Sequence, residues 1–157
     1  MVSGTEAGHP GGVTQVGNSR TAAVVQRLRA EGGRRTPGRI ALLTVLADAP
    51  SHLTTAELHR LVQANGWFLD VSAVHRALVD FTEFGITHSQ PTVNGLGYGL
   101  ADQPHHHAQC TTCGLVTDIP ADTLVEALNA ATASTRFDLR GNGGLLLIGR
   151  GPCCQQI

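Results

Sequence analysis

Ten consecutive residues, HHHAQCTTCG at positions 105–114, gather three of the eight histidines and two of the four cysteines of the chain. Cys110 and Cys113 are separated by two residues, a spacing that lets both sulfur atoms reach one tetrahedral ion. Gly114 follows them and permits the tight backbone turn that such a cysteine knuckle needs. The run therefore predicts a metal-binding knuckle between strand-like flanks.

A complete structural zinc site needs more than these two thiolates, and the other cysteines of the chain are Cys153 and Cys154 in GRGPCCQQI. Neighbouring side chains on an extended strand point to opposite faces, so adjacent cysteines are poor joint ligands. We predict a structural zinc held by Cys110 and Cys113 together with Cys153, Cys154 or both. The alternative is a thioredoxin-like redox motif, but that motif lies where a strand meets a helix.

The histidines predict a second site. On a strand, His105 and His107 project to one face and His106 to the other. Two imidazoles at this spacing can chelate one ion of the zinc, iron, nickel or manganese type. Asp118, on a folded-back strand, can add a carboxylate, and His52 can add a ligand from the first half of the chain, so that the ion bridges two modules. The alternative is that these histidines are exposed polar residues at a strand end.

Apolar residues at helical spacing predict a first module that begins with four helices. Thr36 can cap the second helix with Pro37 in its first turn, and Thr54 and Glu57 form a capping box for the third. Ser72 is expected to cap the fourth. The segments are 21–33, 36–50, 54–66 and 72–85.

The third and fourth helices are joined by the short segment WFLDV, which is typical of a helix-turn-helix. Strand-rich segments around Asn94-Gly95 then predict a tight hairpin, in which Pro91 confines its strand to an edge. A hairpin directly after a helix-turn-helix is a wing. We place this first module at residues 19–101, after a flexible Gly-rich tail of residues 1–18.

Residues 102–157 predict a β-α-β-β module. Its helix covers residues 121–134, with Leu124, Val125 and Leu128 facing inward, and strands follow at 136–140 and 145–149. The fold class is α+β. The sequence shows neither a secretory signal nor an apolar run of the length of a membrane span, so we expect a cytoplasmic protein.

Charge is unevenly distributed along the chain. Lysine is absent, and six of the eleven arginines lie between Arg20 and Arg39, against the single acid Glu31 in that segment. A basic front on a nearly neutral protein suggests a localised anionic partner, with nucleic acid first. The alternative is a solvated helix face.

Taken together, GGRRTPGR, SHLTTAELH, SAVHRAL, HHHAQCTTCG and TDIP resemble the corresponding segments of the ferric uptake regulator (Fur) family of bacterial metal-responsive transcription factors. The similarity covers roughly residues 24–154. It implies a winged helix-turn-helix followed by a small α+β dimerisation domain. It also implies a structural zinc at the cysteines and a second, sensory divalent ion (Zn²⁺, Fe²⁺, Ni²⁺ or Mn²⁺) at His52, His105, His107 and Asp118.

The resemblance also suggests which residues bind DNA. Arg34 and Arg39 would bind phosphates, while Ser72, His75 and Arg76 at the start of the recognition helix would approach base edges. His75 stands where the family usually has a tyrosine.

The carboxylate or thiolate that the family carries in or just after the wing corresponds to Gly99 or Leu100. The sensory site therefore either lacks one ligand or recruits Asp102. The acid and the histidine of a further family site have no clear match, because Val125 and Gly143 fall near those places.

We predict a cytoplasmic homodimeric repressor that binds a palindrome-like double-stranded DNA operator when its sensory ion is bound, and that is not an enzyme. One alternative is a Fur-like regulator that binds DNA without metal, because its sensory site is degenerate. Another is a zinc-dependent hydrolase or metal-storage protein, although the HExxH motif that often marks such hydrolases is absent from the sequence.

Overall fold

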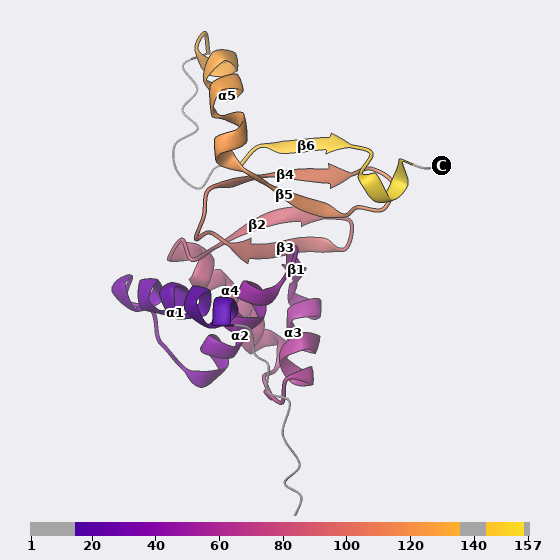
Figure 1. Ribbon diagram of the computed structural model, residues 1–157. Helices are drawn as coiled ribbons and strands as arrows, with labels where there is room; N and C mark the ends of the chain where they lie inside the picture. Colours follow the sequence, from indigo (N-terminus) through magenta and orange to yellow (C-terminus); the bar gives the residue numbers. More distant parts are fainter. Residues whose placement is uncertain (1–14, 136–143, 156–157) are drawn as a thin grey trace, which may run out of the picture.

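The computed structural model describes residues 15–135 and 144–155, except for the side chains of residues 15–18 and of Cys153. The first part of the chain is mostly helical and includes one small sheet (Figure 1). Its elements are α1 (Gln15–Ala30), α2 (Pro37–Asp48), β1 (Leu53–Thr54), α3 (Thr55–Ala64), α4 (Val71–Glu83), β2 (Thr87–Thr92) and β3 (Gly95–Leu100).

The second part contains a second sheet with one short α-helix beside it. Its elements are β4 (His105–Cys110), β5 (Val116–Pro120), the 3₁₀ turn η1 (Ala121–Leu124), α5 (Val125–Thr132), β6 (Leu146–Gly149) and the 3₁₀ turn η2 (Pro152–Cys154). Within the described residues, β4 and β5 precede α5 as two strands separated by the cysteine knuckle, where the prediction counted one strand-like segment around the knuckle. The predicted strand at 136–140 lies outside the described residues.

Helix starts follow the predicted caps with one exception. Thr36 caps α2, and Thr54 and Glu57 form the capping box of α3, which confirms both predictions. The prediction for Ser72 is wrong, because Asp70 is the N-cap of α4 and its carboxylate accepts a hydrogen bond from the Ala73 N–H at 2.6 Å. An extended aspartate two residues earlier starts the helix there and leaves Ser72 inside the first turn.

Helix α1 begins at Gln15, earlier than the predicted start at Thr21 and within the segment that we assigned to the tail. Residues 1–14 lie outside the described part of the chain. The helix ends as predicted, before Gly32, whose φ of 83° is one that L side chains rarely adopt.

The apolar core belongs to the first part of the chain. Its fully buried members come from all four helices and from the segment that enters β2, and they include Leu28, Leu43, Leu58, Phe81 and Ile86. Burying one such side chain stabilises the fold by about 1.5–3 kcal/mol. These contacts make the helices a firm support for the adjacent sheet.

The first sheet, with strand order β1-β3-β2, is antiparallel throughout. Val93 and Asn94 form its two-residue turn, and Gly95 is the first residue of β3 with a φ of 116°, so the turn lies one residue earlier than Asn94-Gly95. Pro91 lies on the edge strand β2, as predicted. The register pairs His88 directly with Gly99.

The second sheet has the order β5-β4-β6, with β4 antiparallel to β5 and parallel to β6. Its helix does not bury the predicted face. Among the described residues no side chain of α5 is buried, and Val125 is 48% exposed. The prediction that Leu124, Val125 and Leu128 face inward is therefore wrong for Val125, whereas Leu124 and Leu128 are half-buried.

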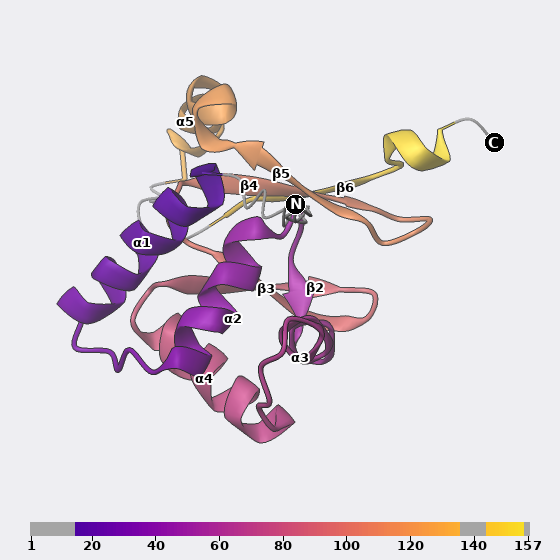
Figure 2. The same ribbon diagram turned by 60° about the horizontal axis from the view of Figure 1, so that its bottom comes forward.

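Two views show how the layers are stacked. Helices α1–α4 lie on one side of the first sheet, the second sheet lies on its other side, and α5 lies beyond the second sheet (Figures 1 and 2). Within the described ranges, none of the helices has the length and apolar character needed to span a membrane. The stacking brings the segment before β1 and the strand β2 close to β4.

Candidate metal centres and DNA-binding face

Four histidines meet where the two sheets face each other. His52 lies just before β1, His88 lies on β2, and His105 and His107 lie on β4. Each offers a ring nitrogen, and these atoms all lie within 4.8 Å of one another. The structure thus brings together three histidines that the sequence singled out and adds His88, which it did not.

Asp118 closes the group from β5, where the register places it opposite His107. Its Oδ1 accepts a hydrogen bond from His107 Nδ1 at 3.2 Å and lies 3.6 Å from His52 Nδ1 and 4.0 Å from His105 Nε2. We call His52, His88, His105, His107 and Asp118 the histidine cluster. Two of its members come from the first part of the chain and three from the second.

The spacing within the histidine cluster suits a metal ion. His88 Nε2 lies 2.7 Å from His52 Nε2 and 3.1 Å from His105 Nε2. Around a tetrahedral zinc with bonds of 2.0–2.1 Å, neighbouring nitrogens are about 3.3 Å apart. In addition, His52 Nδ1 is buried without a hydrogen-bond partner among the described residues, an arrangement that costs about 1–3 kcal/mol. These donors therefore fit a divalent cation.

The protonation states of the histidine cluster also favour metal binding. Burial is the main cause that lowers the pKa of His52 and of His88, in each case to about 4, and the neighbouring imidazoles lower it further. The hydrogen bond from His107 lowers the pKa of the Asp118 carboxyl. At neutral pH the two imidazoles are therefore uncharged and the carboxylate is ionised, which are the forms that bind metal.

His106 and Asp102 lie outside the histidine cluster. His106 points away from its two neighbours, as predicted, and its Nδ1 accepts a hydrogen bond from the Leu145 N–H at 3.1 Å. Asp102 instead forms an ion pair with Arg20 at 2.7 Å. The alternative in which Asp102 replaces the missing wing ligand is therefore not what the structure shows.

Cys110, Cys113 and Cys154 form the second group, with their sulfur atoms within 4.8 Å of one another. Backbone N–H groups, first that of Cys113 and then that of Gly151, lower the pKa of the Cys110 thiol to about 6. Hydrogen-bond donors around the sulfur favour the thiolate, the form that binds zinc. The side chain of Cys153 lies outside the described residues, so its part in the site stays a prediction.

The predicted DNA-binding residues differ in their surroundings. Ser72, His75 and Arg76 are exposed on α4, and Arg34 is exposed before α2. Arg39 instead pairs with Asp80 of α4, and its guanidinium lies 5.4 Å from the centre of the Phe81 ring. Only 16% of the Arg39 side chain is exposed, so part of its role is to hold α2 against α4.

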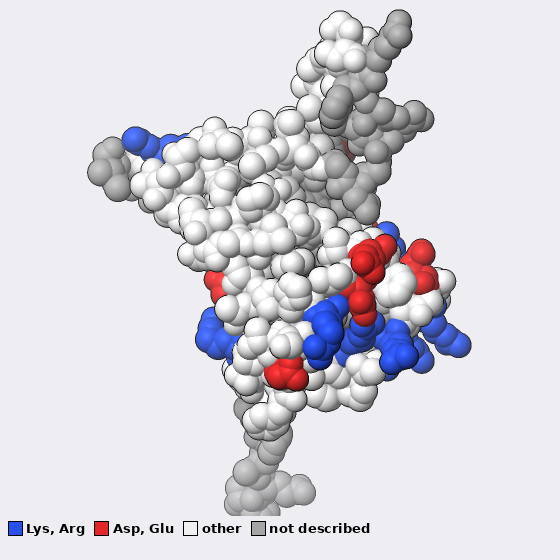
Figure 3. Space-filling model, turned by 180° about the vertical axis from the view of Figure 1, so that it is seen from behind, with Lys and Arg blue, Asp and Glu red and all other residues white. Residues whose placement is uncertain are grey.

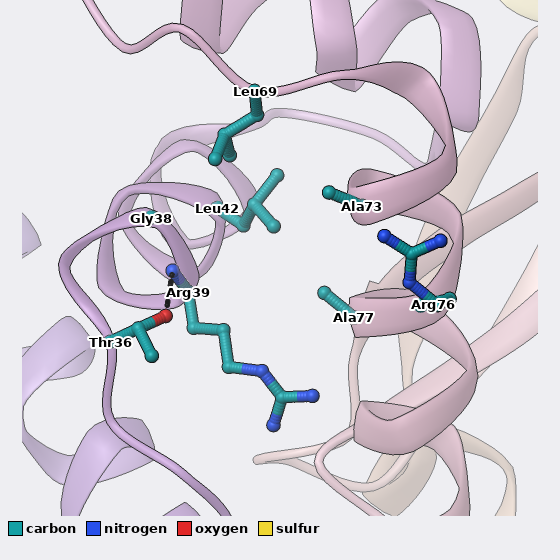
Figure 4. A pocket seen from close by; sticks show the side chains of 8 residues that line it. All are labelled: Thr36, Gly38, Arg39, Leu42, Leu69, Ala73, Arg76 and Ala77. Atoms are coloured by element: carbon teal, nitrogen blue, oxygen red, sulfur yellow. Dashed lines mark hydrogen bonds between the residues drawn. The ribbon is translucent and has the colours of Figure 1, made fainter.

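Arg39 and Arg76 approach the same hollow from α2 and α4 (Figure 4). The hollow has a volume of about 180 Å³, and Leu69 and Ala73 line it as well. Seen from behind, Arg side chains gather over the helical part with acidic side chains among them, whereas the described surface of the second sheet is nearly free of charge (Figure 3). The helical part therefore offers the surface that suits a polyanion.

His88 is the residue that sequence reasoning missed. The available signal was its position on the strand opposite Gly99, the place where the resemblance implied an absent ligand. That signal can be used only if the register of the hairpin is known. The sequence did not give this register, because the observed turn lies one residue earlier than expected.

Comparisons with known proteins agree with this arrangement. The model of the ferric uptake regulator family matches residues 30–141. The peroxide operon regulator of Bacillus subtilis is 28% identical over 120 residues, which is 72% of this chain and 79% of that protein.

Two solved structures show the same fold. The Helicobacter pylori ferric uptake regulator, described with three functional metal-binding sites, has a TM-score of 0.71 at 17% identity and covers 91% of this chain and 96% of its own. A zinc uptake regulator complexed with zinc and DNA has a TM-score of 0.62 at 21% identity, covering 89% of this chain and 95% of its own.

Proposed function

Because the chain belongs to the ferric uptake regulator family, we propose that it is a metal-responsive repressor that binds operator DNA as a homodimer. One observation carries this proposal: the histidine cluster takes donors from both parts of the chain and lies at their boundary. Family membership favours a regulator over a hydrolase or a metal-storage protein, and we expect it to act in the cytoplasm.

The switch depends on donors that belong to different parts of the chain. His52 and His88 are fixed to the first sheet, which packs on the helices, whereas His105, His107 and Asp118 are fixed to the second sheet. A bound divalent cation would supply bonds to both groups. The donors then hold one orientation of the DNA-binding part, and a coupling of about 1–3 kcal/mol changes operator occupancy by 5- to 150-fold.

DNA binding is assigned to the exposed face of α4 and to the segment before α2. Ser72, His75 and Arg76 reach base edges in the major groove, while Arg34 and Arg39 bind phosphates. Because Arg39 also forms an ion pair with Asp80 of α4, it has a second role in orienting that recognition helix. A zinc uptake regulator of the same fold was solved in complex with DNA, which supports DNA as the partner.

Apolar side chains exposed on the surface of the second part support the homodimer. Val125 of α5 and Leu147 and Ile148 of the edge strand β6 are exposed, and no described residue of α5 is buried. A two-fold dimer that covers this surface presents two recognition helices and so matches a palindrome-like operator.

We propose that the cysteines hold a structural zinc. Cys110, Cys113 and Cys154 supply three thiolates, and Cys153 is the candidate for the fourth. Because a site of this kind ties the C-terminal turn η2 to the knuckle after β4, its contribution is to folding rather than to sensing.

A DNA mobility shift assay tests the proposal. Protein that retains zinc at the cysteines should bind operator DNA in the presence of Zn²⁺, Ni²⁺, Fe²⁺ or Mn²⁺ and release it when a chelator empties the histidine cluster. His107→Ala should bind DNA weakly at every metal concentration, while His59→Gln, outside the histidine cluster, should behave as wild type. Equal binding with and without chelator would instead support a regulator that does not depend on a sensory metal.

A further inference from the structure

Where β3 borders the histidine cluster, its residues are Gly97 and Gly99, which have no side chains. A Cβ on Gly99 would lie 2.6 Å from His52 Nε2, and one on Gly97 would lie 3.0 Å from His52 Cβ. Real Cβ atoms essentially never approach other atoms as closely as the first of these distances. The His52 ring thus occupies the space that any side chain at position 99 would need, and β3 supplies no ligand there.

His88 takes that place from the neighbouring strand. It pairs directly with Gly99, and side chains of directly paired residues in an antiparallel sheet share one face. Its ring is stacked on that of His107, with centroids 5.2 Å apart, and its Nε2 lies between ring nitrogens of His52 and His105. The imidazole of His88 therefore supplies, from the paired strand, the donor that position 99 lacks.

We propose, on the basis of the function proposed above, that His88 is a direct ligand of the sensory ion and that the resulting four imidazoles select Co²⁺, Ni²⁺ or Zn²⁺ over Mn²⁺ and Fe²⁺. Imidazole nitrogen binds the later first-row ions more strongly, whereas manganese prefers carboxylate, carbonyl and water oxygens. The histidine cluster offers four imidazole nitrogens and one carboxylate, that of Asp118.

The competing role for His88 is a structural one. Two imidazoles with Nε2 atoms 2.7 Å apart can share a hydrogen bond without any ion, which would make His88 a support for His52. His88→Gln separates the two roles, because its amide keeps a donor and an acceptor but offers no imidazole nitrogen. If His88 only supports His52, His88→Gln should retain metal binding. If His88 is a ligand, His88→Gln should lose metal affinity as His88→Ala does.

Competition with a chromophoric chelator measures the affinities of Ni²⁺, Co²⁺, Mn²⁺ and, without oxygen, Fe²⁺ in full-length protein with zinc kept at the cysteines. We expect wild type to bind Ni²⁺ and Co²⁺ at least about a hundredfold more tightly than Mn²⁺. His88→Ala and His88→Gln should both lose more Ni²⁺ affinity than the about 10- to 100-fold typical of an outer-shell partner. His88→Asp should reduce the difference between the affinities for Ni²⁺ and for Mn²⁺.

A spectroscopic signal accompanies the affinities. The visible absorption of bound Co²⁺ should change in His88→Gln, because a nitrogen ligand is lost, and should be unchanged in the control His59→Gln, whose ring contacts the Leu69 carbonyl instead. Circular dichroism verifies that each variant is folded.

Two results would overturn the inference: His88→Gln with wild-type affinity and Co²⁺ spectrum, or Mn²⁺ bound as tightly as Ni²⁺. Both leave the proposed function intact. That function fails separately, if no metal changes DNA binding.

Discussion

The carboxylate of Asp102 accepts two hydrogen bonds from the guanidinium of Arg20, at 2.7 Å from Nε and 2.9 Å from Nη2. Arg20 belongs to α1, and Asp102 lies in the segment that leads from β3 to β4. The same guanidinium donates to the Ala47 carbonyl, and Arg27 of α1 donates to the carbonyl of Ala101. Helix α1 therefore fixes the connection between the DNA-binding part and the second sheet.

Replacing Arg20 should loosen that connection. Because Arg20 is 40% exposed at the side chain, we expect Arg20→Gln to lower the free energy of unfolding by about 1 kcal/mol, which is the upper end for exposed pairs. Urea denaturation measures the change. Arg29→Gln, on the exposed surface of the same helix, is the matched control and should alter stability by less than about 0.5 kcal/mol.

The same ion pair should make stability depend on acid pH. The hydrogen bond from Arg20 lowers the pKa of the Asp102 carboxyl in the folded protein. The contribution of the pair is then complete above the ordinary aspartate pKa, about 3.9, and is lost as the pH falls through the lower folded value. The stability difference between wild type and Arg20→Gln should stay constant between pH 7 and about pH 5 and shrink below about pH 4. A constant difference at all these pH values would contradict the assignment.

Arg34 and Arg39 should respond differently to replacement. Arg34→Gln should leave stability unchanged, weaken DNA binding and reduce the salt slope of log K by about 1, because one phosphate contact is lost. Arg39→Gln should also lower the free energy of unfolding by about 1–2 kcal/mol, since it loses Asp80 and the face of Phe81. Fluorescence anisotropy at several salt concentrations and urea denaturation together separate the two arginines. Equal stability losses would contradict this division.

Gly99→Ala should weaken metal binding without unfolding the protein. Its added Cβ would lie 2.6 Å from His52 Nε2, so the His52 ring must move away from the other donors. We expect a loss of Ni²⁺ affinity of about tenfold or more, the effect typical of disturbing a ligand's orientation. Gly149→Ala is the control, because a Cβ at that glycine meets no atom of the described residues within 4 Å. Isothermal titration of both variants provides the comparison.

Loss of zinc from the cysteines should act on folding. Cys110→Ser and Cys154→Ser remove thiolates that lie within 4.8 Å of the others, and both should lower zinc content and folded yield. Cys153→Ser decides the fourth ligand: reduced zinc content assigns it to the site, and wild-type content excludes it. Elemental analysis of the purified proteins gives the zinc per chain. A zinc-free Cys110→Ser protein with native circular dichroism would contradict the structural role.

The features that the sequence predicted are mostly local. Thr36 and Thr54 cap their helices because a cap needs only residues up to three positions away. Ser72 was a wrong choice because Asp70 satisfies the same requirement two residues earlier. The position of His88 in the histidine cluster instead depends on the pairing of β2 with β3 and on the packing of two sheets, and neither follows from local pattern.

The orientation of α5 could not be predicted for a related reason. The apolar spacing of Leu124, Val125 and Leu128 correctly indicates a helix with one apolar side, but it does not say which molecule covers that side. Within the described residues that side is covered only in part, since Leu124 and Leu128 are half-buried and Val125 is exposed. Sequence periodicity indicates that this side of the helix needs to be covered, but it does not identify the residues that cover it.

The second part of the molecule buries His106, His107, Cys110 and Cys154, with Val116 as its one buried aliphatic side chain among the described residues. In the function proposed above, metal coordination and contacts with a second subunit would take the place of the apolar interior that the helical half possesses. Dilution and removal of metal should consequently unfold the second part of the chain before the helical part. We expect limited proteolysis of chelated, dilute samples to leave the helical half as the surviving fragment, so that metal supply sets the lifetime of the regulator as well as its shape.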